Sequence, residues 1–519
     1  MAGIDKALKG ESRMLRVVKT ENGIVRGIEA ADPRITAFKG VPFAAPPVGE
    51  NRWRAPQPAE SWEGVLDCSR FKSISMQDTP GLGTDIYCRE WHVDPEIPMG
   101  EDCLYLNIWT PAKTGEEALP VLVWYFGGGL QWGYTSEMEF DGERMARRGI
   151  VVVTVNYRLG VFGFLAHPQL TSEQPDAPTN FGSLDQQAGL NWVRRNIRAF
   201  GGDPDCITIA GQSAGGGSVM SQITCPKNKG LIKRAIVQSG IIRSPYMPDG
   251  FGRPGGMKAV EENGRIFLEE YLGVDTIERA RQLDAFYIRD KYGEYASKHP
   301  RFFTNMDGSF AVGDPVSLCA AGDCLDVDIM AGNTVDEFRS FIPAADDKEL
   351  SAEAEGIFGE KAEKFLALPG ARESDGHGRY ASVSGIEVTA KAMFSRLKEH
   401  FPDKRYYYYR FNPDIPGEDN PGSFHSCELW FMFETLAKCS RPYVGRHYDL
   451  ARQMCNYWCN FIKTGDPNGR DADGSQMPLW EEYTDGSHSG MTFVSEGSVP
   501  EGSDGELVAF LTEHVKNKI

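Results

Sequence analysis

The feature that most limits the possible folds is a serine between two glycines, directly after a short apolar segment. Residues 206–210 read CITIA and residues 211–215 read GQSAG. A short apolar segment of this kind predicts a buried strand, and glycines allow a turn that is too tight for side chains. Together they predict a strand that turns at once into a helix, with Ser213 in a strained backbone conformation that exposes its hydroxyl. The glycine–serine pattern alone is weak evidence, so the rest of the chain has to support this interpretation.

Strand-like and helix-like segments alternate along most of the chain. Residues 121–126 and 150–157 are apolar and rich in β-branched side chains, which predicts strands buried on both faces. Residues 183–200 carry apolar side chains at helical spacing. Further strands are expected at 206–210, 235–238, 327–331 and 406–411, and a further helix at 257–272. This alternation predicts the α/β class, with a mostly parallel sheet and helices on both of its faces.

The opening of the chain departs from this alternation. Residues 16–19 and 23–28 resemble short antiparallel strands, and the segment 40–47, which contains glycine and prolines, predicts turns. The length of 519 residues would by itself suggest about three or four domains. No linker, low-complexity tract or repeat divides the chain, so we expect one domain over residues 1–519. Within it, residues 241–325 are expected to form an insertion that walls a pocket at the carboxyl edge of the sheet.

The composition argues against several classes of partner. The formal net charge is −18, and an acidic surface of that size repels nucleic acids and anionic membranes. No apolar stretch approaches the ~20 residues of a membrane helix, and residues 1–16 lack the apolar centre of a secretory signal. The eleven cysteines have neither CxxC spacing nor the spacing of zinc ligands. We therefore expect a cytoplasmic protein with reduced thiols, no metal site, and no nucleic-acid or membrane partner.

Ser213 needs further groups before it can act as a nucleophile. A hydroxyl is a poor nucleophile near neutral pH unless a base takes its proton, and the resulting oxyanion needs hydrogen-bond donors. Residues 126–129 read FGGG and end the strand that begins at Val121. Peptides without side chains at this position can bring N–H groups close to a substrate oxygen, and the N–H of Ala214 would join them.

The acid and the base should follow the serine along the chain, in that order. Asp336 and Glu337 come shortly after the strand expected at 327–331, and the residues alone do not decide between them. His425 is the best candidate base because it lies in a loop beyond the strand at 406–411 and just before a helix. A buried structural histidine is the alternative interpretation of His425.

Three other histidines, His92, His167 and His447, are not obviously surface residues. The chain order fits only His425 and later histidines.

Longer motifs resemble one known family. They are 38–44 (FKGVPFA), 101–108 (EDCLYLNI), 156–160 (NYRLG), 200–204 (FGGDP) leading to 211–215, 307–308 (DG) and 464–469 (TGDPNG). In this order they resemble the type-B carboxylesterases of the carboxylesterase/lipase family, a group that includes bacterial para-nitrobenzyl esterases and animal cholinesterases. The resemblance covers nearly the whole chain, and it implies the α/β-hydrolase fold.

The resemblance also implies roles for individual residues. The family carries a catalytic glutamate in an Asp-Glu pair, which maps onto Glu337 and not onto Asp336. Residues 424–429 (FHSCEL) are similar to the family's histidine segment, so His425 would be the base for Ser213.

The same resemblance places the oxyanion-hole donors at the N–H groups of Gly128, Gly129 and Ala214. No metal or organic cofactor is implied.

Two departures from the family pattern concern the substrate. Phe338 and Arg339 stand where a glycine is usual, which predicts a bulkier and partly cationic wall. Gln212 stands where cholinesterases carry glutamate, which removes a negative charge that would favour a cationic substrate.

We therefore expect a serine carboxylesterase that forms an acyl-enzyme and accepts small esters with a hydrophobic or aromatic acyl or alcohol group. Leu130, Trp132 and Phe338 are the expected substrate contacts, because aromatic side chains crowd around the glycines and the acid. The alternatives are a specialised feruloyl-type esterase that releases aromatic acids, an amidase for xenobiotics, a lipase acting at an interface, and a non-catalytic binding protein on the same fold. A monomer or a homodimer is expected.

Overall fold

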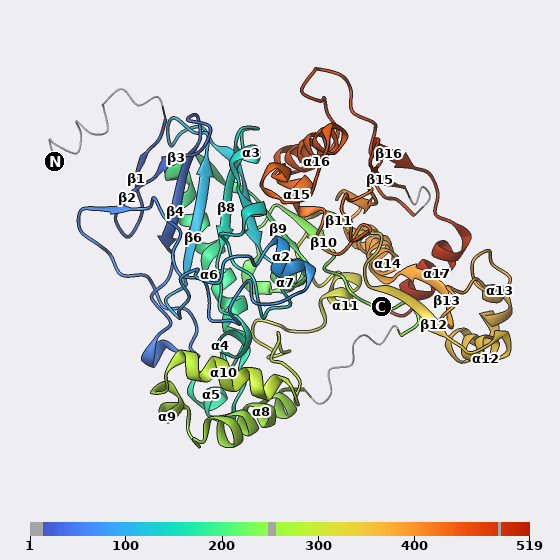
Figure 1. Ribbon diagram of the computed structural model, residues 1–519, viewed down its shortest axis with the longest axis horizontal. Helices are drawn as coiled ribbons and strands as arrows, with labels where there is room; N and C mark the ends of the chain where they lie inside the picture. Colours follow the sequence, from blue (N-terminus) through green and yellow to red (C-terminus); the bar gives the residue numbers. More distant parts are fainter. Residues whose placement is uncertain (1–13, 248–255, 486–488) are drawn as a thin grey trace.

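The structure is a computed structural model that describes residues 14–247, 256–485 and 489–519 (Figure 1). Most of the segment 1–16, which bears on the prediction of no secretory signal, lies outside the described residues. Within the described residues, no helix is both long and apolar enough to cross a membrane.

An eleven-stranded mixed sheet forms the centre of the described part of the chain. From one edge to the other it runs β16 (Gly497–Glu501), β15 (Gly490–Val494), β14 (Tyr406–Phe411), β11 (Asp328–Thr334), β10 (Arg234–Gln238), β9 (Gly202–Gln212), β7 (Leu119–Tyr125), β8 (Val151–Val155), β6 (Tyr105–Thr110), β4 (Thr36–Pro42) and β3 (Ile28–Glu29). The strands from β15 to β8 pair in parallel, and the outer pairs on both sides are antiparallel. The predicted strands at the centre of the sheet are thus confirmed.

Side chains alternate along β7 between two cores, one on each face of the sheet. Val121 and Val123 belong to one buried cluster, whereas Leu122 and Trp124 belong to the other. This alternation is the period of two that a pleated strand imposes. Helices α6 (Phe181–Asn196), α7 (Ala214–Thr224) and α14 (Gly385–His400) pack in the first cluster, and α16 (Gly445–Thr464) packs in the second. Helices therefore cover both faces of the sheet, as predicted.

The prediction of turns over 40–47 is wrong at its beginning, because β4 continues to Pro42. The strand pairing shifts between Phe38 and Val41, which marks a β-bulge. Gly40 lies in this bulge with φ +73, and its N–H donates to Asn107 Oδ1 at 2.9 Å. A bulge uses a glycine at positive φ inside a strand, so the glycine that predicted a turn is part of the sheet.

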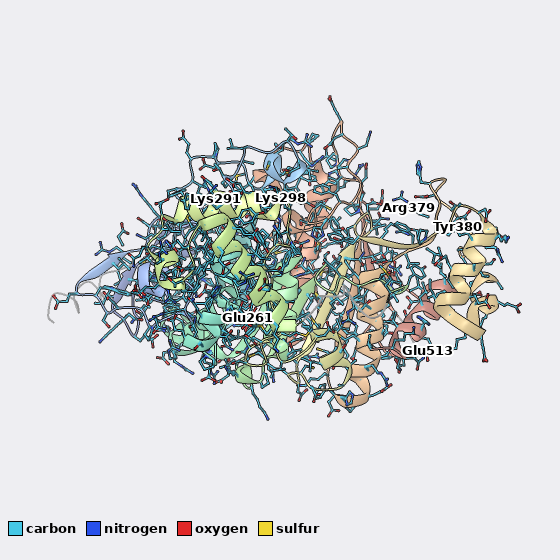
Figure 2. The ribbon with its side chains drawn as sticks, turned by 90° about the horizontal axis from the view of Figure 1, so that it is seen from below. Glu261, Lys291, Lys298, Arg379, Tyr380 and Glu513 are labelled. Carbon is cyan, nitrogen blue, oxygen red and sulfur yellow. The ribbon has the colours of Figure 1, made fainter. Side chains whose placement is uncertain are left out.

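The segment predicted to be an insertion contains a layer of helices. It contains α8 (Gly256–Ile266), the π-helical segment η5 (Phe267–Leu272), α9 (Ile277–Arg281) and α10 (Ala285–Ala296), which lie at the lower left of Figure 1. The helix predicted at 257–272 is therefore α8 continued by a wider π-helical turn. Figure 2 shows Lys291 and Glu261 on these helices, seen from below.

A further group of elements, called the second satellite below, lies at the right-hand end of the long axis in Figure 1, and the sequence patterns did not predict it. It consists of β12 (Arg339–Pro343), α12 (Asp347–Phe358), α13 (Ala362–Leu366), β13 (Arg379–Ser384) and α17 (Glu506–Lys516), around a small hydrophobic core of its own (Figures 1 and 2).

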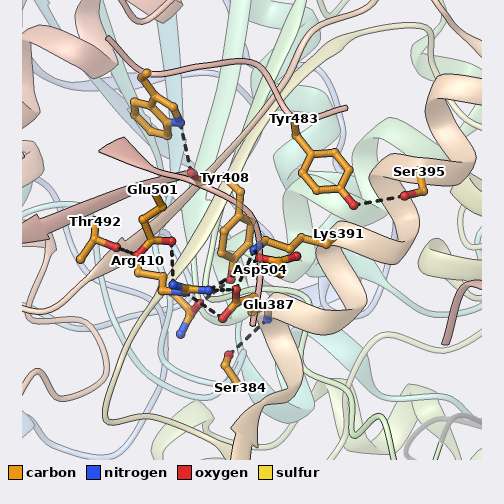
Figure 3. A network of polar contacts seen from close by, with 12 residues as sticks. Ser384, Glu387, Lys391, Ser395, Tyr408, Arg410, Tyr483, Thr492, Glu501 and Asp504 are labelled. Atoms are coloured by element: carbon orange, nitrogen blue, oxygen red, sulfur yellow. Dashed lines mark hydrogen bonds and ion pairs between the residues drawn. The ribbon is translucent and has the colours of Figure 1, made fainter. Parts of the chain in front are cut away.

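A buried ionic network fastens the C-terminal segment to β14 (Figure 3). On α14, Lys391 Nζ lies 2.7 Å from Glu387 Oε1 and also contacts Asp504. Arg410 of β14 contacts Glu387, and its Nη1 lies 2.6 Å from Oε2 of Glu501. These contacts join α14, β14, β16 and the segment before α17 into one unit.

Candidate active site

Ser213 stands at the turn between β9 and α7, as the glycine–serine pattern predicts. Its backbone has φ 57 and ψ −125, a conformation that side-chain-bearing residues rarely adopt. A Cβ at Gly215 would lie 2.1 Å from the carbonyl oxygen of Tyr125, and one at Gly211 would lie 2.4 Å from the backbone carbon of Gly215. The N–H of Ser213 donates to Gln238 O at 2.8 Å. Only glycine fits on either side of the serine, so the sequence pattern has a steric cause.

The glycine loop, residues 127–129, lies against the serine. A Cβ at Gly127 would lie 3.1 Å from Ser213 Cβ. Gly128 and Gly129 have φ values of 92 and 62, which favour glycine. Within the described residues, no hydrogen bond is recorded for the N–H groups of Gly128, Gly129 or Ala214. The predicted oxyanion donors are therefore unpaired peptide groups near the serine.

Glu337 lies beyond the end of β11 and points inward, toward His425. Its Oε2 contacts Nδ1 of His425. Its Oε1 accepts hydrogen bonds from Ser239 Oγ at 2.6 Å and from the N–H of Thr334 at 2.8 Å. The Glu337 side chain is 1% exposed. Ser239 and the backbone of Thr334 thus fix the orientation of the Glu337 carboxylate beside the imidazole.

Asp336, the other candidate acid, has a different position. It is exposed, and its Oδ2 accepts a hydrogen bond from the N–H of Ser423 at 2.9 Å. Asp336 therefore holds the loop that precedes His425 and does not contact the imidazole.

His425 lies between the acid and the residue that precedes the serine. Nε2 of the Gln212 side chain is 3.4 Å from each ring nitrogen of His425. The ring of Phe338 packs against the imidazole edge to face, with 4.6 Å between ring centres. Among the described residues, Ser213 Oγ makes no recorded hydrogen bond with His425. Catalytic hydrogen bonds often form fully only when a substrate is bound.

The other three histidines have structural contacts elsewhere. His92 Nε2 lies 3.3 Å from Glu137 Oε1. His167 Nδ1 accepts from Gln169 N at the start of α5 (Pro168–Glu173). His447 Nδ1 accepts from Val444 N at the start of α16.

The three expected substrate contacts have different environments. Leu130 is 8% exposed and packs in the core. Trp132 donates from Nε1 to Asp78 Oδ2 at 2.9 Å, and Phe338 is 50% exposed beside His425. Arg339 is exposed, and its Nε donates to Ser382 Oγ at 2.8 Å across the β12–β13 pair. The guanidinium of Arg339, the residue after Phe338, is therefore held by the β12–β13 pair.

The sequence patterns missed three residues around this site. Ser239 follows β10 at the carboxyl edge of the sheet, which is the signal that could have identified it. Ser426 donates to Gln212 Oε1 at 3.0 Å and so orients the Gln212 amide. Glu428 is fully buried, and neither of its carboxyl oxygens has a recorded partner among the described residues. Burial raises the pKa of Glu428 well above its ordinary value, and the charge of Glu337 raises it further.

The described residues contain no cluster of three or more His, Cys, Asp or Glu side chains arranged to hold a metal ion.

Comparison with known proteins identifies relatives of this chain. The sequence model of the Carboxylesterase family matches residues 15–510. The fumonisin B1 esterase of Sphingopyxis macrogoltabida is 33% identical over 93% of this chain and 87% of its own length. The para-nitrobenzyl esterase of Bacillus subtilis is 32% identical over 90% of this chain and 93% of its own length.

Solved structures of two esterases have the same fold. The carboxylesterase EST55 of Geobacillus stearothermophilus aligns with a TM-score of 0.72 at 29% identity, covering 96% of this chain and 99% of that one. A structure of PNB esterase aligns with a TM-score of 0.75 at 28% identity, covering 97% and 99%. The chain therefore belongs to the carboxylesterase family, with the α/β-hydrolase fold, and it is a carboxylic ester hydrolase.

Proposed function

We propose that this esterase uses a serine mechanism in which Ser213 is the nucleophile, His425 the general base and Glu337 the residue that orients the base. The observation that carries the proposal is the contact between Glu337 and His425 beside the strained turn at Ser213. These three side chains come from three loops at the carboxyl edge of the sheet, which is where active sites of open α/β sheets occur.

In the first half-reaction, His425 takes the proton of Ser213 as Oγ attacks the ester carbonyl carbon. The negative charge that develops on the carbonyl oxygen is stabilised by the N–H groups of Gly128, Gly129 and Ala214. His425 then gives its proton to the leaving alcohol, and an acyl-serine ester remains.

In the second half-reaction, His425 takes a proton from water, which attacks the acyl-serine carbon. The acid product leaves when Ser213 regains the proton from His425. Glu337 keeps Nδ1 of the imidazole protonated, so that the other ring nitrogen is free to act as the base.

We propose that the substrate carries a hydrophobic or aromatic group. The exposed ring of Phe338 beside His425 and the indole of Trp132 beside Gly129 support this proposal. Two relatives are named as esterases of fumonisin B1 and of para-nitrobenzyl esters, and the para-nitrobenzyl group is aromatic. A cytoplasmic location and a monomeric or homodimeric state stay predictions.

The test is hydrolysis of para-nitrophenyl esters from acetate to octanoate by the wild type and by Ser213→Ala. We expect the variant to lose turnover of every ester while its circular dichroism spectrum and melting temperature stay close to those of the wild type. Undiminished turnover in Ser213→Ala would reject the serine mechanism, and the chain-length optimum of the wild type would size the acyl pocket.

A further inference from the structure

Buried hydrogen bonds fasten the segment after the glycine loop to the insertion. Nε2 of Gln131 donates to the carbonyl oxygen of Phe302 at 2.8 Å. The hydroxyl of Tyr292 donates to Gln131 Oε1 at 2.8 Å and accepts from the N–H of Phe302 at 3.0 Å. Gln131 is 5% exposed and Phe302 is 1% exposed. The position of the residue before Phe302, Arg301, is therefore fixed beside the glycine loop.

Arg301 stacks on the tryptophan that follows the loop. Its Cζ lies 4.7 Å from the centre of the Trp132 ring. A Cβ at Gly129 would lie 3.8 Å from Cζ3 of the same indole. One indole ring thus separates a guanidinium from a peptide group that is proposed to bind the oxyanion.

Arg301 is partly buried and has no recorded hydrogen bond or ion pair within residues 14–247, 256–485 and 489–519. The carboxylate of Asp78 accepts a hydrogen bond from Nε1 of the same indole. Asp78 and Arg301, both described residues, form no recorded ion pair with each other. A guanidinium stacked on an aromatic ring keeps its planar fork of donors free, and this fork matches the geometry of a carboxylate.

A second arginine beside the site provides a contrast. Arg441 lies 5.4 Å over the ring of Phe424, next to the histidine. Its Nη2 lies 2.6 Å from Glu90 Oε1 and its Nη1 lies 3.0 Å from Asp419 Oδ1. Two carboxylates neutralise this guanidinium, whereas Arg301 keeps its charge available.

We propose that Arg301 binds a carboxylate of the substrate, so that the enzyme acts on esters that also carry a free carboxylate group. The inference rests on the proposed function, since it assigns the substrate class of the same site. The chain has a formal net charge of −18, which disfavours anionic substrates at long range. A local unpaired cation is what such a substrate needs to bind against that field.

The test compares pairs of esters that differ by one carboxylate. On the acyl side, the pairs are mono-para-nitrophenyl adipate with para-nitrophenyl hexanoate, and mono-para-nitrophenyl suberate with the octanoate. On the alcohol side, the pair is 4-acetoxybenzoate with phenyl acetate. For each pair, the ratio of kcat/KM for the anionic ester to kcat/KM for the neutral ester is measured, because comparing this ratio between variants cancels the intrinsic reactivity of the esters.

We expect Arg301→Gln to lower this ratio by about tenfold or more in at least one pair, because a charge-assisted hydrogen bond is lost. Arg301→Lys should keep part of the preference, since it keeps the charge and loses the planar fork. Arg339→Gln is the matched control: it removes one positive charge from the residue after Phe338 and should leave the ratio unchanged. Melting temperatures establish that each variant is folded.

The inference is wrong if Arg301→Gln leaves the ratio unchanged in every pair, or if Arg339→Gln lowers it equally. Either result, together with turnover of neutral esters that depends on Ser213, rejects the inference alone. Absence of turnover of all six esters by the wild type rejects the proposed function, and the inference with it.

Discussion

At the scale of single residues, steric limits explain the motif at the turn. Gly215 lies where a Cβ would meet the carbonyl oxygens of Tyr125 and Phe126, at 2.1 and 2.7 Å. We expect Gly215→Ala to lower the free energy of unfolding by at least about 4 kcal/mol, because the added Cβ would clash with rigid backbone. Thermal or urea unfolding measures this loss.

Gly217 is the matched control, in the same helix. A Cβ there meets only Gly240 O, at 3.9 Å. Gly217→Ala should leave stability unchanged or raise it by up to about 1 kcal/mol, because alanine favours the helix. Equal losses in the two variants would contradict the steric account.

Substitution of each of the adjacent residues Asp336 and Glu337 tests the proposal that Glu337 is the residue that orients His425. Glu337→Gln should lower kcat by about 10³–10⁴-fold, because the amide no longer stabilises the imidazolium or fixes its tautomer. Asp336→Asn alters only the hydrogen bond to Ser423 N, so its effect on kcat should be far smaller. Steady-state kinetics on one para-nitrophenyl ester compares them, and an equal loss in both variants would be inconsistent with the assignment.

The sequence predicted that Ser213, the glycines and His425 each lie beyond a strand of the parallel sheet, and the structure has them in those positions. The residues alone did not decide between Asp336 and Glu337, since both follow the same strand. The orientation of Glu337 depends on Thr334, at the end of β11 itself, and on Ser239, which follows the neighbouring strand β10. Contacts between strands are not encoded in the local pattern.

At the scale of elements, the segment after the glycine loop and the segment after α15 (Leu429–Met432) meet at a buried carboxyl group. Glu139, in η2 (Met138–Phe140), is 0% exposed, and neither oxygen has a recorded partner in the described part of the chain. Thr435, which follows α15, donates to the carbonyl oxygen of Glu139 at 3.1 Å. Burial raises the pKa of Glu139 well above its ordinary value, and the nearby carboxylate of Glu137 raises it further. His92 is the cation-forming group that faces this pair, 3.3 Å from Glu137.

The raised pKa of Glu139 predicts a loss of stability as the pH rises above about 4.5. The folded state holds the Glu139 proton more tightly than the unfolded chain does, so this stabilisation is complete below the ordinary pKa of 4.5 and is lost as the pH rises toward the folded pKa. Between about pH 5 and 9, the melting temperature of the wild type should fall more than that of Glu139→Gln, which cannot ionise. Parallel curves for the two proteins would show that Glu139 does not titrate in this way.

The predictions of elements failed where tertiary contacts override local pattern. Gly40 reads as a turn residue, yet it forms a bulge because Asn107 on the neighbouring strand bonds its N–H. The second satellite was missed because its strands β12 and β13 are short and pair across a long separation in sequence.

At the scale of the whole molecule, the buried ionic network of Figure 3 joins the C-terminal segment to the sheet. The side chains of Lys391, Glu387 and Asp504 are 1%, 7% and 2% exposed. We expect Lys391→Met to destabilise the fold by about 3–5 kcal/mol, because it removes one of the two cations, Lys391 and Arg410, that compensate the buried carboxylates of Glu387 and Asp504. Lys291→Met is the control: it removes a lysine whose partner Glu294 is exposed, and it should change stability by less than about 0.5 kcal/mol. Chemical unfolding compares the two, and similar losses would contradict the role of burial.

The same network predicts that protonation of Glu387 contributes to unfolding at acid pH. The pKa of Glu387 is lowered to about 2: burial opposes this shift, but Lys391 and Arg410 overcome it. Its stabilisation is therefore present above the ordinary pKa of 4.5 and is lost as the pH falls toward 2. The pKa of Asp504 is raised, chiefly by burial, which offsets part of this loss. In Glu387→Gln, the melting temperature should depend less on pH below about 4.5 than in the wild type, and an unchanged dependence would contradict this account.

The central claim of the account is that Ser213 is an activated nucleophile, and stoichiometric labelling tests it most directly. The wild type is treated with a para-nitrophenyl alkylphosphonate, and intact-mass and peptide mass spectrometry locate the adduct. We predict one phosphonyl group per chain, on Ser213, with esterase activity lost in proportion to labelling, and no adduct in Ser213→Ala. An adduct on another residue that abolishes activity, or full activity in a chain labelled at Ser213, would contradict the account.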